Sequence, residues 1–597
     1  MAERKKQMNR DKVSRLVNWG HWFAFFNGFL AMLAGTRYLS SAGYPDSLFS
    51  WGYIGLSTIG HFTFLAFLVY LVFIFPVTLL LPYSKILRGY TATIYSIALY
   101  AILYDTLIFD DYGIHLSPFA FDLAWQDLSS ILRNTSYISV PIGILLLELT
   151  AANFIWKRID KIQKKQAGNK VVLFVGACFV SGHLIHIWAD ATQYTEITRF
   201  DDAYPLSYPA TARSFIANRG IENFNDEARP SYLQQKSRHL NYPISPMQCS
   251  NDFQSNVLVV TVDSFRADMV TPLTMPFLSG YQSNHFNFNN HYTGGNQFYT
   301  GMFSLLYGVQ TNYSDRIEFS YTPPVITGVM QDQGYELQIF SADDSVDSLR
   351  NSAIFEGFEV NVFENVSSAS TDAEIVNHFS KWQSQQDKPW FSIVNLTTPR
   401  DYDTPVGFLG IETIKSPESF KPAQKVLFNQ YRQSLFYLDQ QLEKLLSSLP
   451  ADTSVIITGT HGQVFTSNER DARRDFSPGN VKVPLIMRLP EAKHSNIKYR
   501  TSHYGLVPTL LTHLFGCTNP TTDYSSGRSL FQPSTDTWVY IGNSRVFAIY
   551  QREEVTVLNR HGKYEIYDLE FTKQLDKRMS APELIQVMRE SRRLYNN

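Results

Sequence analysis

Long apolar runs dominate the first 190 residues, whereas short apolar and polar stretches alternate from residue 191 to residue 597. A helix that crosses a membrane needs about 20 mostly apolar residues. Five segments meet this requirement, with ends defined to within a few residues. They are residues 17–38, 54–81, 87–109, 137–156 and 170–189. The pattern predicts a transmembrane domain of five helices over residues 1–190.

The first and second of these segments carry further signals. Residues 17–38 lack the short apolar core and small-residue cleavage site of a signal peptide, so we expect them to remain as a helix. The second segment is long and contains Pro76, which predicts a tilt or a kink.

Charges in the loops predict the orientation. Basic residues gather before the first segment and in the loops after the second and the fourth, and the other two loops are neutral or acidic. The basic residues are Arg4, Lys5, Lys6, Arg10, Lys12, Arg15, Lys85, Arg88, Lys157, Arg158, Lys161, Lys164, Lys165 and Lys170. Because basic loops stay in the cytoplasm, we expect a multi-pass inner-membrane protein with a cytoplasmic N-terminus. An odd number of spans then places the C-terminal domain in the periplasm.

Four ionisable residues lie within the predicted spans: Asp105, Glu148, His183 and His186. Such residues are costly in lipid and often functional. We expect Asp105 and His186 near an interface, where they reach water. Glu148 lies deepest, and it faces either another helix or a partner protein. The five spans show no repeat and no pair of short broken helices, which argues against a transporter.

Residues 191–250 form a predicted interfacial linker. Aromatic residues open it and basic residues follow, a composition that suits phosphate-bearing lipid headgroups at a membrane surface. For the whole segment, a solvated linker with ordinary surface charge is the favoured interpretation. For residues 204–219, which come soon after the last span, the position favours lipid contact. The aromatic, proline and basic residues noted over the whole segment are Tyr204, Pro205, Tyr208, Pro209, Arg213, Arg219, Arg229, Lys236 and Arg238.

Residues 251–597 have the pattern of an α/β domain, in which a mainly parallel sheet is covered by helices. The clearest helix is expected over residues 423–449. Its core positions follow helical spacing: Val426, Leu427, Tyr431, Leu435, Leu438, Leu442, Leu445 and Leu446. The predicted strands are Asn256–Val262, Tyr335–Phe340, Trp390–Asn395, Ser454–Thr458 and Pro484–Arg488.

Three strand or turn ends carry candidate chemistry, and ligands of open α/β sheets bind at the carboxyl ends of strands. Asp263 follows the first strand, Thr460 and His461 follow the fourth, and a glycine-flanked turn over residues 294–301 precedes a helix whose N-terminus suits an anion. An oxygen-rich site with one imidazole suits Mg²⁺, Mn²⁺ or Zn²⁺. Such a metal would polarise a phosphoryl or sulfuryl oxygen and activate a hydroxyl nucleophile. Taken alone, Asp263 is equally explained as a helix N-cap.

The net charge and the number of cysteines narrow the possible functions and the possible disulfides. The net charge of −2 argues against bulk nucleic-acid binding. Of the three cysteines, Cys178 lies in an apolar run, so Cys249–Cys517 is the one disulfide outside the spans that the count permits. Free cysteines are commonly buried, and two buried free thiols are the favoured interpretation.

Several motifs together resemble the sulfatase superfamily, which includes phosphoethanolamine and phosphoglycerol transferases. Within it, the whole chain is similar to the YejM/PbgA inner-membrane proteins, which have five spans and the same order of parts. The resemblance implies a periplasmic domain of the sulfatase/alkaline-phosphatase type over residues 251–597. The motifs are Val262–Asp268, Phe355–Phe358, Thr460–Gly462, Val483–Ile486, Tyr204–Arg213 and Gly562–Leu569.

The resemblance implies a sensor of lipopolysaccharide that contacts lipid A and tunes lipid A synthesis through a membrane protein acting as adaptor of a protease. The resemblance also implies an alternative function, which is the binding and transport of cardiolipin. The implied lipid-contact residues are Tyr208, Thr211, Arg213, Ser214 and Arg219. Ser214 departs from the compared member, which has a second Arg there, and this weakens the expected phosphate contact.

The resemblance also implies an incomplete active site. Asp263, Thr460 and His461 correspond to metal ligands, but active transferases carry Asp where Thr460 stands, so one anionic ligand is lost. Thr300 is the nearest hydroxyl to the nucleophile position, yet its register is shifted by three residues, and Thr293 is a poorer candidate. We therefore expect a degenerate or weakly active site, in which Asp263 and His461 retain a metal for structure. The alternative is a metal-dependent phosphoryl or phosphoethanolamine-type transferase or hydrolase.

Overall fold

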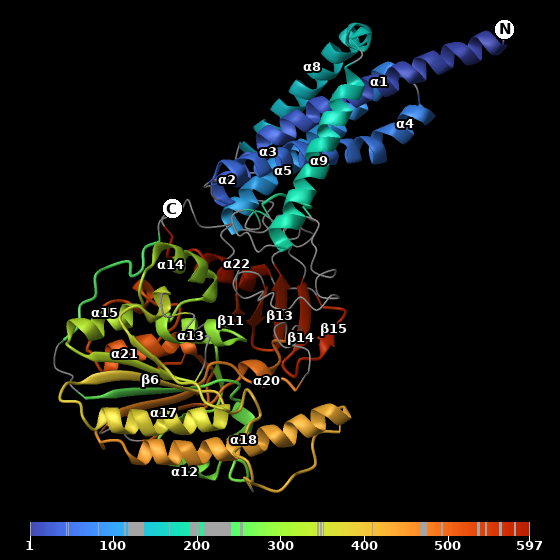
Figure 1. Cartoon of the computed structure of the whole chain (residues 1–597). Coiled ribbons are helices and arrows are strands. Elements are labelled where there is room, and N and C mark those ends of the chain that lie inside the picture. The colour runs from blue at the N-terminus through green and yellow to red at the C-terminus, as the bar shows by residue number, and fades with distance from the viewer. Residues whose placement is uncertain are drawn as a thin grey trace. The chain divides into compact units, whose positions relative to one another are not determined.

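The structure is a computed structural model, and the chain forms two compact units (Figure 1). The first contains the described residues up to 207, and the second contains those from 240 onward. The structure describes residues 2–42, 45, 47–81, 83–112, 115–116, 136–165, 167–191, 197, 200, 203–207, 240–250, 255–342, 346, 349, 352–408, 410–418, 420–465, 475–490, 494–533, 538–543, 546–559, 564–577 and 581–595.

The first unit is a helix bundle. Its helices are α1 (Ala2–Gly35), α2 (Arg37–Ala42), α3 (Leu48–Val69), α4 (Phe75–Leu80), α5 (Ser84–Tyr112), α8 (Ser136–Lys164) and α9 (Gly168–Ala191). Within the described residues, four stretches are long and apolar enough to cross a membrane: Leu48–Leu80, Ser84–Phe109, Ser139–Lys164 and Gly168–Ala189. Asn18, His21 and Asn27 interrupt the apolar run of α1. The unit thus has four to five apolar helices, in agreement with the predicted membrane domain.

The long second span is irregular next to Pro76. Residues Tyr70–Ile74 form a π-helical turn between α3 and α4, and the Phe75 N–H bonds to the carbonyl of Tyr70, five residues earlier. Proline has no N–H to donate and its ring displaces the preceding turn. The π turn is the local adjustment at the position where the sequence predicts a tilt or a kink.

Polar side chains inside the bundle have partners on neighbouring helices. The side-chain amide of Asn27 on α1 donates to Glu148 on α8 at 3.1 Å, so Glu148 faces another helix. Asp105 accepts from the Tyr38 hydroxyl at 2.5 Å and lies 2.7 Å from Nδ1 of His115. The expectation that Asp105 and His186 reach water is wrong: they are 2% and 0% exposed. Donors around Asp105 take the place of water.

An eight-stranded sheet forms the centre of the second unit, in the order β5-β4-β6-β1-β7-β8-β2-β9. The strands from β5 to β7 are parallel, and β8 pairs antiparallel with β7 and with β2. The five predicted strands are confirmed as β1, β4, β6, β7 and β8. The bounds are β1 (Val257–Val262), β2 (Phe286–Phe288), β4 (Glu336–Ser341), β5 (Glu359–Val362), β6 (Trp390–Leu396), β7 (Ser454–Gly459), β8 (Leu485–Arg488) and β9 (Asn496–Ile497).

Helices cover both faces of this sheet (Figure 1). Val257 and Val259 of β1 belong to one hydrophobic core and Leu258 and Val260 to the other, as the alternation along a strand requires. Helices α12 (Pro276–Asn284), α17 (Ser368–Gln383) and α18 (Pro422–Ser447) pack on one face. Helices α13 (Phe298–Tyr307), α15 (Val325–Asp332) and α21 (Leu506–His513) pack on the other. Further helices are α14 (Ser314–Ser320), α20 (Pro478–Val481) and α22 (Ala581–Glu590).

The helix predicted over residues 423–449 is confirmed as α18, with one error among its core positions. Val426 is 58% exposed. It lies two residues, or about 200° of rotation, from the buried Phe428, and therefore on the opposite side of the helix. Tyr431, Leu435, Leu438, Leu442, Leu445 and Leu446 are buried as predicted.

A second sheet was not predicted from the sequence. Five antiparallel strands follow one another in chain order, and a two-stranded parallel ribbon pairs β3 (His291–Tyr292) with β10 (Thr501–Ser502). The strands of the second sheet are β11 (Val539–Gly542), β12 (Val546–Tyr550), β13 (Glu554–Asn559), β14 (Tyr564–Asp568) and β15 (Lys573–Gln574). Strands β11 and β12 are apolar but only four and five residues long, and β13, β14 and β15 carry polar or charged residues, so this sheet lacks the long apolar runs that mark the central sheet.

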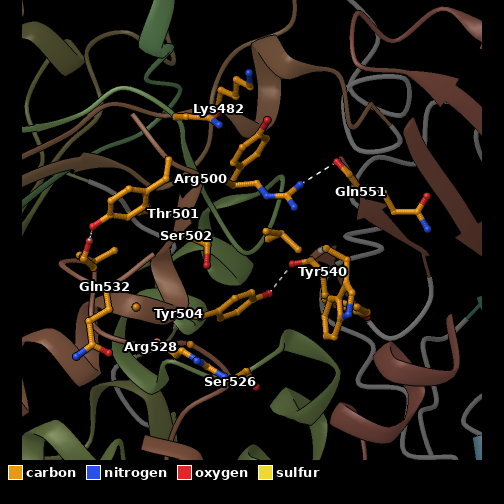
Figure 2. Close-up of a pocket in the computed structure, with 18 of the residues that line it drawn as sticks. Lys482, Arg500, Thr501, Ser502, Tyr504, Ser526, Arg528, Gln532, Tyr540 and Gln551 are labelled. Atoms are coloured by element: carbon orange, nitrogen blue, oxygen red, sulfur yellow. Dashed lines mark hydrogen bonds between the residues drawn. The ribbon is translucent and has the colours of Figure 1, made fainter. Parts of the chain in front are cut away.

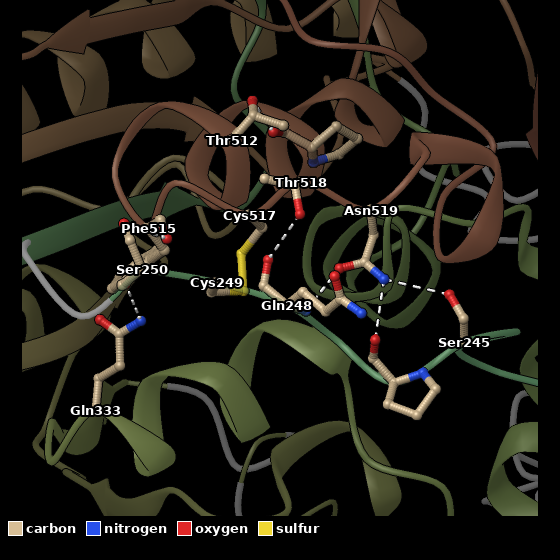
Figure 3. The surroundings of a disulfide bond; sticks show 12 residues. Ser245, Gln248, Cys249, Ser250, Gln333, Thr512, Phe515, Cys517, Thr518 and Asn519 are labelled. Carbon is tan, nitrogen blue, oxygen red and sulfur yellow. Dashed lines mark hydrogen bonds between the residues drawn. A yellow bond between two sulfur atoms is a disulfide. The ribbon is translucent and has the colours of Figure 1, made fainter.

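Cys249 and Cys517 form a disulfide (Figure 3), so the expectation of two buried free thiols is wrong. Backbone hydrogen bonds on both sides of the pair hold the two segments next to each other. The N–H of Ser250 donates to Phe515, and the N–H of Thr518 donates to Gln248, both at 3.0 Å. This pairing of distant segments, which brings the two sulfur atoms within bonding distance, is not visible in the sequence. Cys178 is a buried free thiol.

Candidate functional site

Asp263 and Thr460 meet at the carboxyl edge of the central sheet. Strands β1 and β7 are parallel neighbours with Val262 opposite Gly459, so the residues that follow them emerge side by side. Both side chains are buried, and the Thr460 hydroxyl donates a hydrogen bond to Oδ1 of Asp263. The register of two adjacent parallel strands therefore creates this pair directly.

Two further groups face the carboxylate of Asp263. Nε2 of His461 lies 4.0 Å from Oδ1, and Nη1 of Arg400 lies 3.9 Å from Oδ2. Nδ1 of His461 donates to the carbonyl of Gly462 at 2.7 Å, which fixes the ring and turns Nε2 toward Asp263. The structure thus brings Asp263, Thr460 and His461 together and adds Arg400, which the sequence did not reveal.

These donors supply part of a metal site. A carboxylate and an imidazole are ordinary ligands of Mn²⁺ or Zn²⁺, but catalytic zinc sites usually have three protein ligands. The third position here is Thr460, whose hydroxyl is donated to Asp263. Within the described part of the chain, no three His, Cys, Asp or Glu side chains are grouped so that they could hold a metal. The donor set therefore does not fit a complete catalytic metal centre.

Thr300 lies in the first turn of α13, close to the same edge of the sheet. It is 4% exposed, and its hydroxyl donates to the carbonyl of Gln297 at 3.1 Å. The hydroxyl of Thr293 donates to the carbonyl of Thr460 at 2.7 Å. Both candidate nucleophiles are therefore engaged with backbone carbonyls, which stabilises the turn before α13.

Two buried histidines behind this edge were not singled out from the sequence. His503 lies between the hydroxyls of Thr458 and Ser304, at 3.3 Å from each, and its ring is 5.2 Å from that of His291. Burial lowers the pKa of His503 to about 3 and holds the pKa of His291 well below its ordinary value. Both rings are therefore neutral at physiological pH. Neither follows a predicted strand, so no sequence signal marked them.

The predicted lipid-contact residues lie outside the described residues: Tyr208, Thr211, Arg213, Ser214 and Arg219. The start of the same segment is described, and it belongs to the helix bundle. The hydroxyls of Tyr204 and Thr58 are 2.6 Å apart, and His61 Nε2 lies 2.9 Å from the carbonyl of Pro205. The Tyr204 ring stacks on the ring of His61.

Comparison with known proteins gives the family. Residues 5–249 match a domain of unknown function, DUF3413, and residues 255–517 match the sulfatase family. The inner membrane protein YejM of Salmonella typhi is 30% identical over 605 residues, which cover 99% of each chain. This chain belongs to the YejM family of inner membrane proteins. An uncharacterized protein of Haemophilus influenzae is also 30% identical over 588 residues, covering 95% of this chain and 94% of that protein.

Solved structures resemble this chain more distantly than YejM does. A protein of the alkaline phosphatase superfamily from Vibrio parahaemolyticus has a TM-score of 0.46 and 18% identity, covering 59% of this chain and 89% of its own. The periplasmic domain of EptC from Escherichia coli, solved in complex with Zn, has a TM-score of 0.39 and 15% identity, covering 50% of this chain and 92% of its own. The predicted YejM-type resemblance and the sulfatase-like domain are both confirmed by the family matches.

Proposed function

We propose that this protein is an inner-membrane regulator that senses lipopolysaccharide through residues 204–219 of its interfacial linker and controls lipid A synthesis. The observation that carries the proposal is the attachment of Tyr204 and Pro205 to Thr58 and His61 of the helix bundle. This attachment supports a position at the membrane surface for the basic residues that follow, among them Arg213 and Arg219.

The bundle geometry supports the periplasmic side for this surface. At one end, the guanidinium groups of Arg15 and Arg88 lie over the ring of Trp156, and Arg15 pairs with Asp160 at 2.8 Å. The ring of Tyr204 contacts that of Tyr38, just beyond the other end of α1. Twenty helical residues separate Arg15 from Gly35, a rise of about 30 Å, which matches the apolar thickness of a bilayer. Since basic ends stay in the cytoplasm, the end with Tyr204 faces the periplasm.

The disulfide supports the same orientation for the second unit. Disulfides persist in oxidising compartments such as the periplasm and are rare in the cytosol. Cys249 lies at the end of the interfacial linker, and its bond to Cys517 lies within the second unit.

The candidate active site supports regulation over catalysis. A carboxylate that already accepts from Thr460 and faces Arg400 is compensated without a metal, and the Thr300 hydroxyl is bound to a backbone carbonyl. We propose that Asp263, Thr460 and His461 stabilise the domain. The lipid A signal then passes to a membrane protein that acts as adaptor of a protease.

The test measures lipid A synthesis in a knockout strain complemented with variants at matched expression. We expect Arg213→Ala/Arg219→Ala to lose control of lipid A, while Asp263→Ala/His461→Ala retains it. Lys236→Ala/Arg238→Ala is the matched control, because it removes the same charge from a later part of the same segment. If the Asp263→Ala/His461→Ala and Thr300→Ala variants fail and the arginine variant does not, the protein is an enzyme and the proposal is wrong.

A further inference from the structure

A cavity of about 390 Å³ lies within the second unit (Figure 2). Its walls come from the β3–β10 ribbon, the turn around Tyr504, the loop from Ser526 to Gln532 and strand β11. The volume falls in the range of about 300–1,000 Å³ that is typical of small-ligand sites. None of Asp263, Thr300, Thr460 or His461 lines it.

The charge of the lining is entirely positive. Lys482, Arg500, Arg528 and Arg552 line the cavity, and the described lining contains no Asp or Glu. Four like charges around one cavity repel each other, and low-dielectric walls strengthen the potential inside it. An anion in the cavity would relieve this repulsion. Arginine in particular forms paired hydrogen bonds with phosphate oxygens.

The inner cations are held in position by the protein. Nη1 of Arg500 donates to the carbonyls of Tyr550 and Gln551, at 3.0 and 2.8 Å. The ammonium group of Lys482 lies 5.3 Å from the ring centre of Tyr292. Burial, followed by the charge of Arg500, lowers the pKa of Lys482. A preorganised cation loses less entropy on binding, which favours a specific ligand.

The rest of the lining is polar and aromatic. The Tyr504 hydroxyl donates to the carbonyl of Tyr540 at 2.7 Å, and Ser502, Ser526 and Gln532 add hydroxyl and amide groups. Arg528 and Arg552 are exposed. We propose that this cavity binds a phosphate monoester of a small polar molecule, of the size of a sugar phosphate. The proposal concerns a second site and is independent of the lipid contact proposed for residues 204–219.

Calorimetry on the full-length protein in neutral-detergent micelles tests the site. Glucose 6-phosphate is the soluble probe, and glucose is its uncharged match. We expect saturable binding of glucose 6-phosphate, no binding of glucose, and about tenfold or more weaker binding in Arg528→Gln/Arg552→Gln, because two charge-assisted contacts are lost. Both arginines are exposed, so this variant should fold. The matched control is Lys381→Gln/Lys388→Gln, which removes two exposed charges elsewhere in the same unit.

A second arm distinguishes a free ligand from a lipid headgroup. Dispersed lipid A replaces the soluble probe, in an Arg213→Ala/Arg219→Ala background that removes the lipid contact proposed for the linker. Binding of either probe that weakens in Arg528→Gln/Arg552→Gln supports the proposed site in the cavity. If the probe is glucose 6-phosphate, the ligand is a free phosphate monoester, and if it is lipid A, the ligand is a lipid headgroup. The proposal is overturned if neither probe binds, or if the cavity variant binds as tightly as the lysine control.

Discussion

The carboxylate of Asp263 is buried at the end of β1, where a charge is stable only if donors or cations surround it. Thr460 donates to one of its oxygens, and Arg400 lies near the other. The threonine hydroxyl at this position satisfies one carboxylate oxygen through a hydrogen bond. Thr460, which stands where the resemblance implies an Asp ligand, is therefore also one of the residues that compensate Asp263.

Replacing Thr460 with Val tests this compensation. The substitution keeps the shape and removes the donor, so we expect the free energy of unfolding to fall by about 1–3 kcal/mol, as for a buried polar group that loses its partner. Urea denaturation of the full-length protein, followed by tryptophan fluorescence, measures the change. Thr460→Ser keeps the hydroxyl and should lose less than Val does. Equal losses in the two variants would mean that the hydrogen bond contributes little.

At this scale, the sequence predicted residues that follow buried strands and missed those that reach the site from loops or from inside the fold. Asp263, Thr460 and His461 stand directly after apolar runs, so their place at the sheet edge follows from the strand pattern. Arg400 lies four residues beyond β6, and His503 approaches from a short turn. Their positions depend on loop paths and packing, which residue spacing does not encode.

The first turn of α13 is in close contact with the residue after β7, because the residue of α13 at the point of contact is a glycine without a side chain. A Cβ built on Gly301 would lie 2.0 Å from the carbonyl oxygen of Thr460. This approach brings the turn before α13 to the edge that carries Asp263. The geometry of the site thus depends on the distance between one helix and one strand.

We expect Gly301→Ala to destabilise the second unit by about 1–3 kcal/mol or more, because backbone atoms must move to relieve the overlap. Gly328→Ala in α15 is the matched control, since a Cβ there meets no heavy atom within 4 Å. Alanine in a helix interior should stabilise that variant by about 0.5–1 kcal/mol. Thermal unfolding of both proteins gives the comparison. If Gly301→Ala leaves the stability of the second unit unchanged, α13 must shift without an energetic cost.

Secondary structure was predictable where burial is complete. Strands β1, β6 and β7 are buried at every residue and appear in the sequence as continuous apolar runs. Strands β13 and β14 mix apolar residues with polar and charged ones, and β15 has only two residues. Their pairing comes from chain reversal and from packing against Tyr292 and Phe476, which no local pattern specifies.

At the scale of the whole molecule, one covalent bond joins Cys249, which precedes the residues that match the sulfatase family, to Cys517, the last of them. Cys249 and Cys517 are 268 residues apart in the chain, so their bond closes a loop that contains the entire central sheet. A crosslink over a loop of this length restricts the unfolded chain strongly. The bond therefore contributes to the stability of the domain chiefly by lowering the entropy of its unfolded state.

Removing the bond should lower the free energy of unfolding of the second unit by about 2–5 kcal/mol. The variant is Cys249→Ser/Cys517→Ser, compared with the wild-type protein before and after reduction. We expect reduction to destabilise the wild type to the level of the variant and to leave the variant unchanged. An effect of reductant on the variant would implicate a different thiol, and Cys178→Ser is the control for it.

The position of this bond also determines how the domain responds to mechanical force. At the end of the linker, the backbone N–H of Asn241 donates to the carbonyl of Leu594, and that of Ile244 donates to Asp523. Cys249 follows these hydrogen bonds in the chain and precedes β1. A pull from the membrane side would first shear those contacts. The tension would then pass through two sulfur atoms to the segment after α21, so that β1 carries little of it. Under oxidising conditions, stretching the linker should leave the central sheet intact, whereas in reduced protein the same pull would peel β1 out from between β6 and β7.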